Sequence, residues 1–353
     1  MPIETELVVR IAYIGPNWGT SLHRAAALRR LGHDVSIVDP WSYFGRSPWV
    51  GRWIHYAGAF GMSKLIDKPV LRNVQEADPD LVWVNQGEFL GPHLLKRLRA
   101  LSVPIVNYMN DDPFGGHRNG LRFRLYLEAV PYYDLLAVVR EPNVTEATAH
   151  GARRVIRIHM SADEVAHRPR ELTHEDLVQY GSEVAFVGTW LSERGPFMAE
   201  LIRLGLPLAI WGDRWHKARE WSVIQPHWRG PGVYDERYAK AILSAKVVLG
   251  LLSKENRDLH TSRSMEIPAL GAVFCAERTS EHMSLYDDGV EAVFWSTPEE
   301  CAAACHRLLA EEAYRKAVAR RGRERVQRNG HYNEQVLTGI LHELVAGGVD
   351  SKR

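Results

Sequence analysis

VVRIAYIGPNWGTSLHRAAALRRLGHDVSIV, residues 8–38, predicts two strands joined by a loop and a helix. Val8–Ile14 is a mostly apolar run rich in β-branched residues, which favours a buried strand. The small-residue turn Gly15–Ser21 follows, and Leu22–Leu31 has the periodicity of a helix. A glycine ends this helix, and Val35–Asp39 is a second apolar run. The segment therefore predicts one βαβ unit with parallel strands.

The same alternation continues through both halves of the chain. The further strands expected in the first half are Leu81–Val84, Pro104–Tyr108, Leu135–Val139 and Arg154–Ile158. After a polar connection at residues 161–181, the strands expected are Glu183–Val187, Leu208–Gly212, Val247–Leu252, Ala272–Cys275 and Ala292–Phe294. The helices expected are Pro92–Leu101, Met198–Gly205, Tyr234–Ser244, Pro298–Glu311, Ala313–Gln327 and His331–Val345. Such alternation is typical of mostly parallel sheets covered by helices on both faces.

The length of the chain, 353 residues, is too great for one such core and suits two. We therefore expect an α/β protein with two Rossmann-like domains that face each other across a cleft. The expected domains are residues 1–165 and residues 166–330. Residues 331–353 are expected to form a C-terminal helix that packs back on the N-terminal domain.

Charge and composition exclude some classes of partner. The chain has 44 Lys and Arg against 43 Asp and Glu, a formal charge of +1, which argues against a nucleic-acid partner. No run of about 18 apolar residues is present, so no membrane span is expected. No secretion signal is visible at the N-terminus, and we expect a cytoplasmic protein.

The three cysteines, Cys275, Cys301 and Cys305, have neither the spacing of a metal site nor the even number of a disulfide framework. We interpret them as packing residues in a reducing compartment. The sequence thus predicts no metal site.

The densest polar segment of the chain, Lys254–Glu266, follows an apolar strand and precedes a helix. Loops after the strands of open α/β sheets lie where ligands bind. The carboxylates of Asp258 and Glu266 suit sugar hydroxyls, because they accept hydrogen bonds. The cation of Arg263 suits phosphate oxygens, as do the hydroxyls of Thr261 and Ser262. A solvated surface loop is the alternative.

Two other strand ends carry small residues. Gly15 and Gly19 flank a strand-to-helix turn, where backbone amides favour an anionic or polar ligand; a tight turn is the equal alternative. Gly188 and Thr189 end the first strand of the second half, and Arg194 follows within reach of a bound diphosphate. A surface salt bridge is the alternative for Arg194. We count these residues as donor-binding candidates.

Acidic residues follow a strand of the N-terminal half. Asp111, Asp112 or His117 could act on an acceptor hydroxyl, since a general base must lie near the incoming nucleophile. The adjacent carboxylates also resemble half a metal site, but only two ligands are in view. A turn or N-cap role remains open for either aspartate.

The segment NRDLHTSRSMEIPALG, residues 256–271, together with Glu277–Thr279 and Glu281-His282, resembles the CgeB-type, spore-maturation-related glycosyltransferases of the GT-B fold. Looser matches are PDLV at 79–82, GEFL at 87–90, DDPFG at 111–115 and VAFVG at 184–188. The resemblance extends from about Arg10 to Tyr332.

The resemblance implies that the C-terminal domain holds a nucleoside diphosphate sugar and the N-terminal domain presents the acceptor. In similar enzymes that retain anomeric configuration, two acidic residues eight apart mark the donor site. Asp258, where Glu is commoner, and Glu266 fall on those positions. By this carry-over Glu266 binds the donor ribose and Asp258 holds the sugar, while Arg263 and Arg194 neutralise the diphosphate. His260 and Thr279 lie in the matching segments and join the donor-binding candidates.

The resemblance implies a retaining, hexosyltransferase-type enzyme. Its partners would be a nucleoside diphosphate sugar and an acceptor that is a saccharide, a protein or a small molecule. Fixed cations can stabilise a departing diphosphate, so we expect no metal and no other cofactor. A nucleotide-sugar epimerase of the same architecture and a non-catalytic sugar-nucleotide binding protein are the alternatives.

Overall fold

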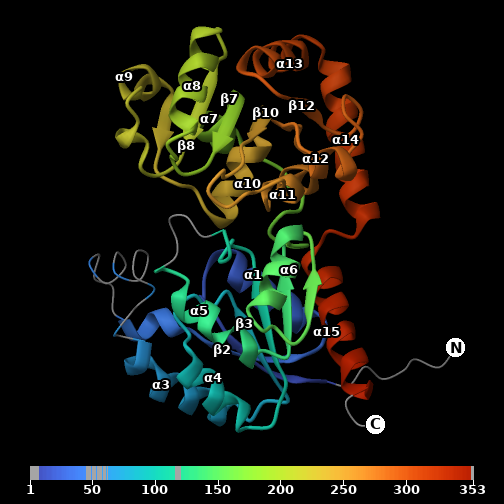
Figure 1. Ribbon diagram of the computed structural model, residues 1–353. Helices are drawn as coiled ribbons and strands as arrows, with labels where there is room; N and C mark the ends of the chain where they lie inside the picture. Colours follow the sequence, from blue (N-terminus) through green and yellow to red (C-terminus); the bar gives the residue numbers. More distant parts are fainter. Residues whose placement is uncertain are drawn as a thin grey trace, which may run out of the picture. The chain divides into compact units, whose positions relative to one another are not determined.

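The computed structural model describes residues 8–44, 49, 53, 58, 61, 63–115 and 121–350, without the side chains of 347–350. The chain divides into two compact units (Figure 1). Unit 1 comprises Met1–His159, Glu255–Arg257 and Asn333–Arg353, and unit 2 comprises Met160–Lys254 and Asp258–Tyr332. Each unit is built around its own six-stranded sheet, in which all described strand pairs are parallel. The predicted α/β class is confirmed.

The sheet of unit 1 has the strand order β2-β1-β3-β4-β5-β6. Its strands are β1 (Arg10–Ile14), β2 (Asp34–Val38), β3 (Leu81–Asn85), β4 (Ile105–Met109), β5 (Leu135–Val138) and β6 (Val155–Arg157). Strands β3, β4 and β5 are buried along their whole length, because helices cover both faces. The strand order reverses between β1 and β3. The helices that follow these two neighbouring strands therefore cover opposite faces of the sheet.

Helices from distant parts of the sequence cover the two faces of this sheet (Figure 1). On one face, α1 (Gly19–Arg30) packs against α15 (Asn333–Asp350), with Leu28, Leu337 and Ile340 in the shared core. The helices of the other face are α3 (Ser63–Glu76), α4 (Pro92–Arg99), α5 (Arg124–Ala129) and α6 (Glu141–Ala149), with the short η1 (Pro40–Phe44) and η2 (Val130–Tyr132) beside them. The last helix of the chain therefore completes the core of unit 1.

The sheet of unit 2 has the order β12-β11-β10-β7-β8-β9. Its strands are β7 (Ser182–Val187), β8 (Leu208–Trp211), β9 (Trp228–Gly230), β10 (Ala245–Gly250), β11 (Phe274–Glu277) and β12 (Val293–Trp295). Its helices are α7 (His174–Tyr180), α8 (Arg194–Arg203), α9 (Trp221–Ile224), α10 (Asp235–Leu243), α11 (Arg263–Leu270), α12 (Ser280–Leu285), α13 (Pro298–Ala310) and α14 (Glu312–Asn329), with the 3-10 turns η3 (Trp215–Lys217) and η4 (Gln225–His227). Here the order reverses between β10 and β7.

Several elements were not predicted from the sequence, and they include α3, α5, α6, α7, α9, α12 and β9. Helix α3 has Pro69 in its interior, which interrupts the usual helix signal. Strand β9 is a three-residue edge strand whose Trp228 and Arg229 are exposed, so it lacks the apolar pattern of a buried strand. Among the described helices, none combines the length and the hydropathy needed to cross a bilayer.

Candidate functional site

The candidate site lies where the strand order of unit 2 reverses. Strands β7 and β10 pair in parallel, so their carboxyl ends lie at the same edge of the sheet. Helix α8, which follows β7, contributes Met198 to one core, and helix α11, which follows β10, contributes Met265 to the core on the opposite face. The two connections diverge here, and ligands of open α/β sheets bind at such reversal points.

Two guanidinium groups lie at this edge. Arg194 donates through Nη1 to the carbonyl of Thr189 at 2.8 Å, and through Nη2 to the carbonyls of Leu251 and Leu252 at 3.3 and 3.2 Å. Arg263 donates through Nε to the carbonyl of Val187 at 2.8 Å. The loops after both strands are thus held by the two cations.

These cations have no carboxylate within ion-pair distance in residues 160–332, all of which the structure describes. Burial, with repulsion from Arg263, lowers the pKa of Arg194 to about 10, so Arg194 is still charged at neutral pH. The terminal nitrogens of Arg263 form no hydrogen bond with the described protein. The edge therefore carries positive charge that an anionic ligand can neutralise.

Glu266 is the buried carboxylate of the site and is 4% exposed. The Tyr238 hydroxyl donates to Oε2 at 2.8 Å, and His167 Nε2 lies 3.8 Å from Oε1. Burial alone would raise the pKa of Glu266, but His167, Arg263 and hydrogen bonds from Tyr238 and Ser262 hold that pKa below its ordinary value. Glu266 is consequently ionised at neutral pH and can accept hydrogen bonds from a ligand.

The other predicted residues after β10 are Asp258, His260, Thr261 and Ser262, and of these His260 is engaged by the protein itself. Asp258 is 8% exposed, and Thr261 and Ser262 are half-buried beside the start of α11. His260 serves the protein itself, since Nε2 accepts from the backbone N–H of Met160 at 3.0 Å, which leaves Nδ1 to donate to Glu281. This contact fixes the chain where unit 2 begins.

Thr279 is also occupied by the protein. Its hydroxyl donates to the carbonyl of Leu259 at 2.6 Å and accepts from the N–H of His282 at 3.0 Å, which makes it the N-cap of α12. His282 lies in a segment that carries the resemblance but was not among the predicted site residues. Its ring lies between Ser264 (2.8 Å) and the carbonyl of Glu277 (2.6 Å). Burial lowers the pKa of His282 to about 4, so this ring stays neutral and supports α11.

Close packing at the strand ends explains why glycine occupies Gly188 and Gly15. At Gly188, a Cβ would lie 2.7 Å from Phe186 Cζ, so no side chain fits beside Arg194. Gly15 belongs to unit 1, and a Cβ there would lie 2.9 Å from Cβ of Asn85, on the neighbouring strand β3. Gly19 begins α1 with a φ of 57°, a backbone conformation that favours glycine. Gly15 and Gly19 thus lie near the reversal point of unit 1, whereas the other donor-binding candidates belong to unit 2.

The predicted acidic residues of unit 1 are both in ion pairs. Asp112 receives Nε and Nη2 of Arg257 at 2.5 and 2.9 Å, and its side chain is 0% exposed. It also accepts from the Gly115 N–H at 3.1 Å, which is the turn role left open by the sequence. Asp111, whose side chain is 20% exposed, binds Arg122 at 2.8 Å. His117 lies outside the described residues.

We expect Asp112→Asn to destabilise unit 1 by about 1–3 kcal/mol at pH 7, because it removes the charge facing Arg257. Burial would raise the pKa of Asp112, but Arg257 and Asn143 hold it below its ordinary value of 3.8. A carboxyl with a lowered pKa stabilises the fold above its ordinary pKa, and this stabilisation is lost as the pH falls through the folded pKa. Urea unfolding should therefore show a difference between wild type and variant at pH 7 that shrinks below about pH 4.

The exposed Asp34 of β2 provides a matched control. Asp34→Asn should leave the midpoint of urea unfolding unchanged, both at pH 7 and below about pH 4. A loss for Asp112→Asn that does not depend on pH would contradict an electrostatic role for the Asp112–Arg257 pair.

Comparisons with known proteins agree on one fold. Residues 194–342 match the family described as glycosyl transferase-like, whereas no curated protein matches the chain in sequence. HepE from Anabaena, solved with UDP and glucose, is similar with a TM-score of 0.67 and 12% identity, over 96% of this chain and 100% of that chain. The sucrose-phosphate synthase from Thermosynechococcus elongatus gives a TM-score of 0.66 and 13% identity, over 96% and 99%.

A third similar structure is the α,α-trehalose 6-phosphate synthase from Burkholderia multivorans, with a TM-score of 0.63 and 12% identity over 98% of this chain and 99% of that chain. At such low identity, the likeness establishes the architecture and leaves the substrates open. The chain has the GT-B fold of these glycosyltransferases, and its residues 194–342 match the glycosyl transferase-like family.

Proposed function

We propose that this protein is a glycosyltransferase that binds a nucleoside diphosphate sugar at the reversal point of the unit 2 sheet. The observation that supports this most strongly is the grouping of Arg194, Arg263 and the ionised Glu266 at one sheet edge. Two cations suit a diphosphate, and a buried carboxylate suits the hydroxyls of a ribose. The segment that matches the glycosyl transferase-like family contains all three residues.

Each residue has a distinct role in this proposal. The terminal nitrogens of Arg263 contact the diphosphate, while Arg194 positions the loops after β7 and β10 and adds to the positive field. The free lone pairs of Glu266 accept from the ribose, and Asp258 accepts from the donor sugar. Unit 1 presents the acceptor, where Asp111 keeps access to solvent and Asp112 does not.

The proposed reaction breaks the bond between the sugar and the diphosphate, so negative charge grows on the departing phosphate oxygen. Fixed cations aimed at this oxygen lower the barrier, because they need not reorganise during the reaction. The acceptor hydroxyl forms the new glycosidic bond and loses its proton. We propose retention of configuration, a hexose as the transferred sugar and a CgeB-type protein, on the resemblance of residues 256–271.

Donor binding and turnover test this function. HepE has been solved with UDP-glucose, so UDP-glucose is the first donor to test, followed by other nucleoside diphosphate sugars. Calorimetry would detect binding, and mass spectrometry would detect a glycosylated acceptor. An altered sugar without acceptor would indicate an epimerase, and binding without any turnover over a broad acceptor panel would indicate a non-catalytic binding protein.

We expect transfer to be independent of divalent metal, because Arg194 and Arg263 supply the positive charge at the diphosphate. Initial rates measured with EDTA and with added Mg²⁺ should agree within about twofold, well below the effect of one lost electrostatic contact. Restoration of a lost rate by Mg²⁺ would show that the two guanidiniums do not suffice.

A further inference from the structure

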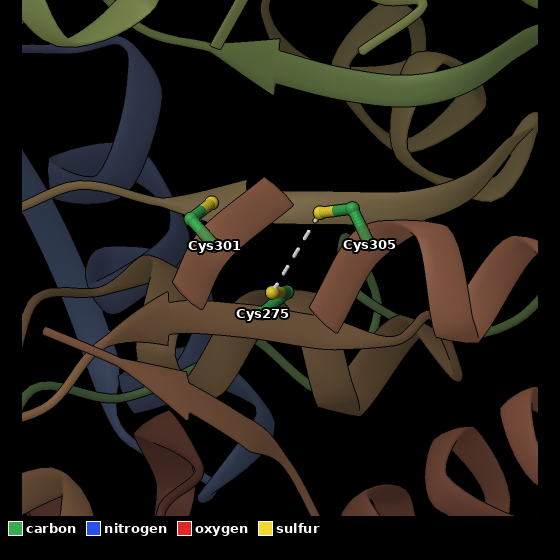
Figure 2. Close-up of side chains that lie close together, drawn as sticks. All are labelled: Cys275, Cys301 and Cys305. Atoms are coloured by element: carbon green, nitrogen blue, oxygen red, sulfur yellow. Dashed lines mark hydrogen bonds between the residues drawn. The ribbon is translucent and has the colours of Figure 1, made fainter. Parts of the chain in front are cut away.

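The three cysteines of the chain meet at one point in unit 2. Cys275 lies on β11, and Cys301 and Cys305 lie one helical turn apart on α13, as Figure 2 shows. Their sulfur atoms all lie within 4.8 Å of one another, and the sulfurs of Cys275 and Cys305 are 4.0 Å apart. All three residues are 0% exposed.

This arrangement combines every cysteine of a 353-residue chain into one cluster. The i, i+4 spacing puts Cys301 and Cys305 on the face of α13 that packs on the sheet, and Cys275 points to the same layer from the strand. Isolated buried cysteines are common as small apolar residues. Three sulfurs facing one another form a donor set, and the proposed glycosyl transfer does not use them.

We propose that Cys275, Cys301 and Cys305 form a three-coordinate binding site for a soft, thiophilic metal ion, monovalent copper. A metal–sulfur distance of about 2.3 Å, as in thiolate sites, puts the sulfurs of a planar three-coordinate site about 4.0 Å apart. That separation equals the observed one for Cys275 and Cys305 and is within reach for Cys301 after a small side-chain shift.

The choice of ion follows from the donor set. Thiolates favour Cu(I) and zinc among first-row metals, but structural zinc is almost always held by four ligands. Among the described residues, no other group of three His, Cys, Asp or Glu side chains could hold a metal ion, and none joins this cluster as a fourth ligand. The surrounding side chains, such as Leu249 and Leu308, are apolar, which disfavours a bound water as the fourth ligand.

Cu(I) titration tests the site directly. Because the sulfurs are buried, the full-length protein is refolded under nitrogen with Cu(I) and also titrated in its folded form, with bicinchoninate as the competing chelator. We expect one equivalent of bound Cu(I) and three sulfur ligands by X-ray absorption spectroscopy. Cys275→Ser and Cys305→Ser should each weaken binding at least 100-fold, and Zn(II) should bind at least 100-fold more weakly than Cu(I).

Control variants show whether the three sulfurs themselves hold the ion. His306→Ala removes the other potential metal ligand next to Cys305 and should leave Cu(I) binding unchanged. If a serine variant fails to fold by circular dichroism, Cys301→Ala replaces it, since alanine suits the apolar core.

Three results would overturn the proposal. The first is no Cu(I) binding by wild type after refolding, which would leave three packing thiols or, if mass spectrometry shows a loss of two hydrogens in air, a disulfide. The second is binding that persists in the cysteine variants. The third is equal affinity for Zn(II). None of these results bears on donor binding at Glu266, so the site and the proposed glycosyl transfer are tested separately.

Discussion

Glu266→Gln is expected to weaken donor binding by about 10- to 100-fold, since hydrogen bonds to charged groups contribute about 1.5–3 kcal/mol. The substitution keeps the shape of the side chain but removes the charge that the site holds in its ionised form. Glutamine can still accept the hydrogen bond from Tyr238, so the fold should survive. Calorimetry with UDP-glucose, or with the donor that binds best, measures the change.

Tyr238→Phe is the informative companion to this variant. It leaves Glu266 charged but removes one contact that orients the carboxylate, so a smaller loss of about 3- to 10-fold is expected. Glu236→Gln, on the exposed face of the same helix α10, should have no effect. Wild-type affinity in Glu266→Gln would remove this residue from the donor site.

Arg263→Ala is expected to lower kcat by about 100- to 1000-fold, the range found when one group that stabilises transition-state charge is removed. Of the two guanidiniums, Arg263 is the one whose terminal nitrogens form no hydrogen bond with the described protein, so they can contact a ligand. Steady-state rates of sugar transfer, measured at saturating donor, report this effect.

Two further variants distinguish charge from geometry. Arg263→Lys retains a cation but loses the planar fork, so it should recover only part of the rate. Arg203→Ala changes an exposed arginine on α8 that pairs with Glu200, and it should leave the rate unchanged. An Arg263→Ala enzyme with wild-type kcat would show that the charge of the leaving group is stabilised elsewhere.

The sequence predicted the parts of the fold that depend on local pattern. Apolar runs gave most strands, and the polar segment after β10 was expected at a sheet edge because parallel strands end together there. The pairing of β7 with β10 then brings Arg194 close to the loop at Leu251, although 57 residues separate them. Local pattern alone does not specify which strands become neighbours.

Contacts made across the fold were missed for the same reason. Tyr238 and His167 hold Glu266 from positions 28 and 99 residues away, and neither carries a recognisable signal. Asp112 was considered as a base, but its ion pair with Arg257 depends on a loop 145 residues further on. His260 was expected to bind the donor, and only the structure shows both of its ring nitrogens engaged by protein groups.

The helix α15 has a consequence for how the chain is made. Its Leu337 and Ile340 belong to the same core as Leu28 of α1, so the core of unit 1 stays incomplete during synthesis until these two residues have been added. At about 5–20 residues per second, synthesis of the segment between α1 and α15, residues 31–332, leaves the apolar face of α1 uncovered by α15 for roughly 15–60 s. Unit 2 differs in this respect, because the helices that cover its sheet all lie between residues 174 and 329 and are made before α15.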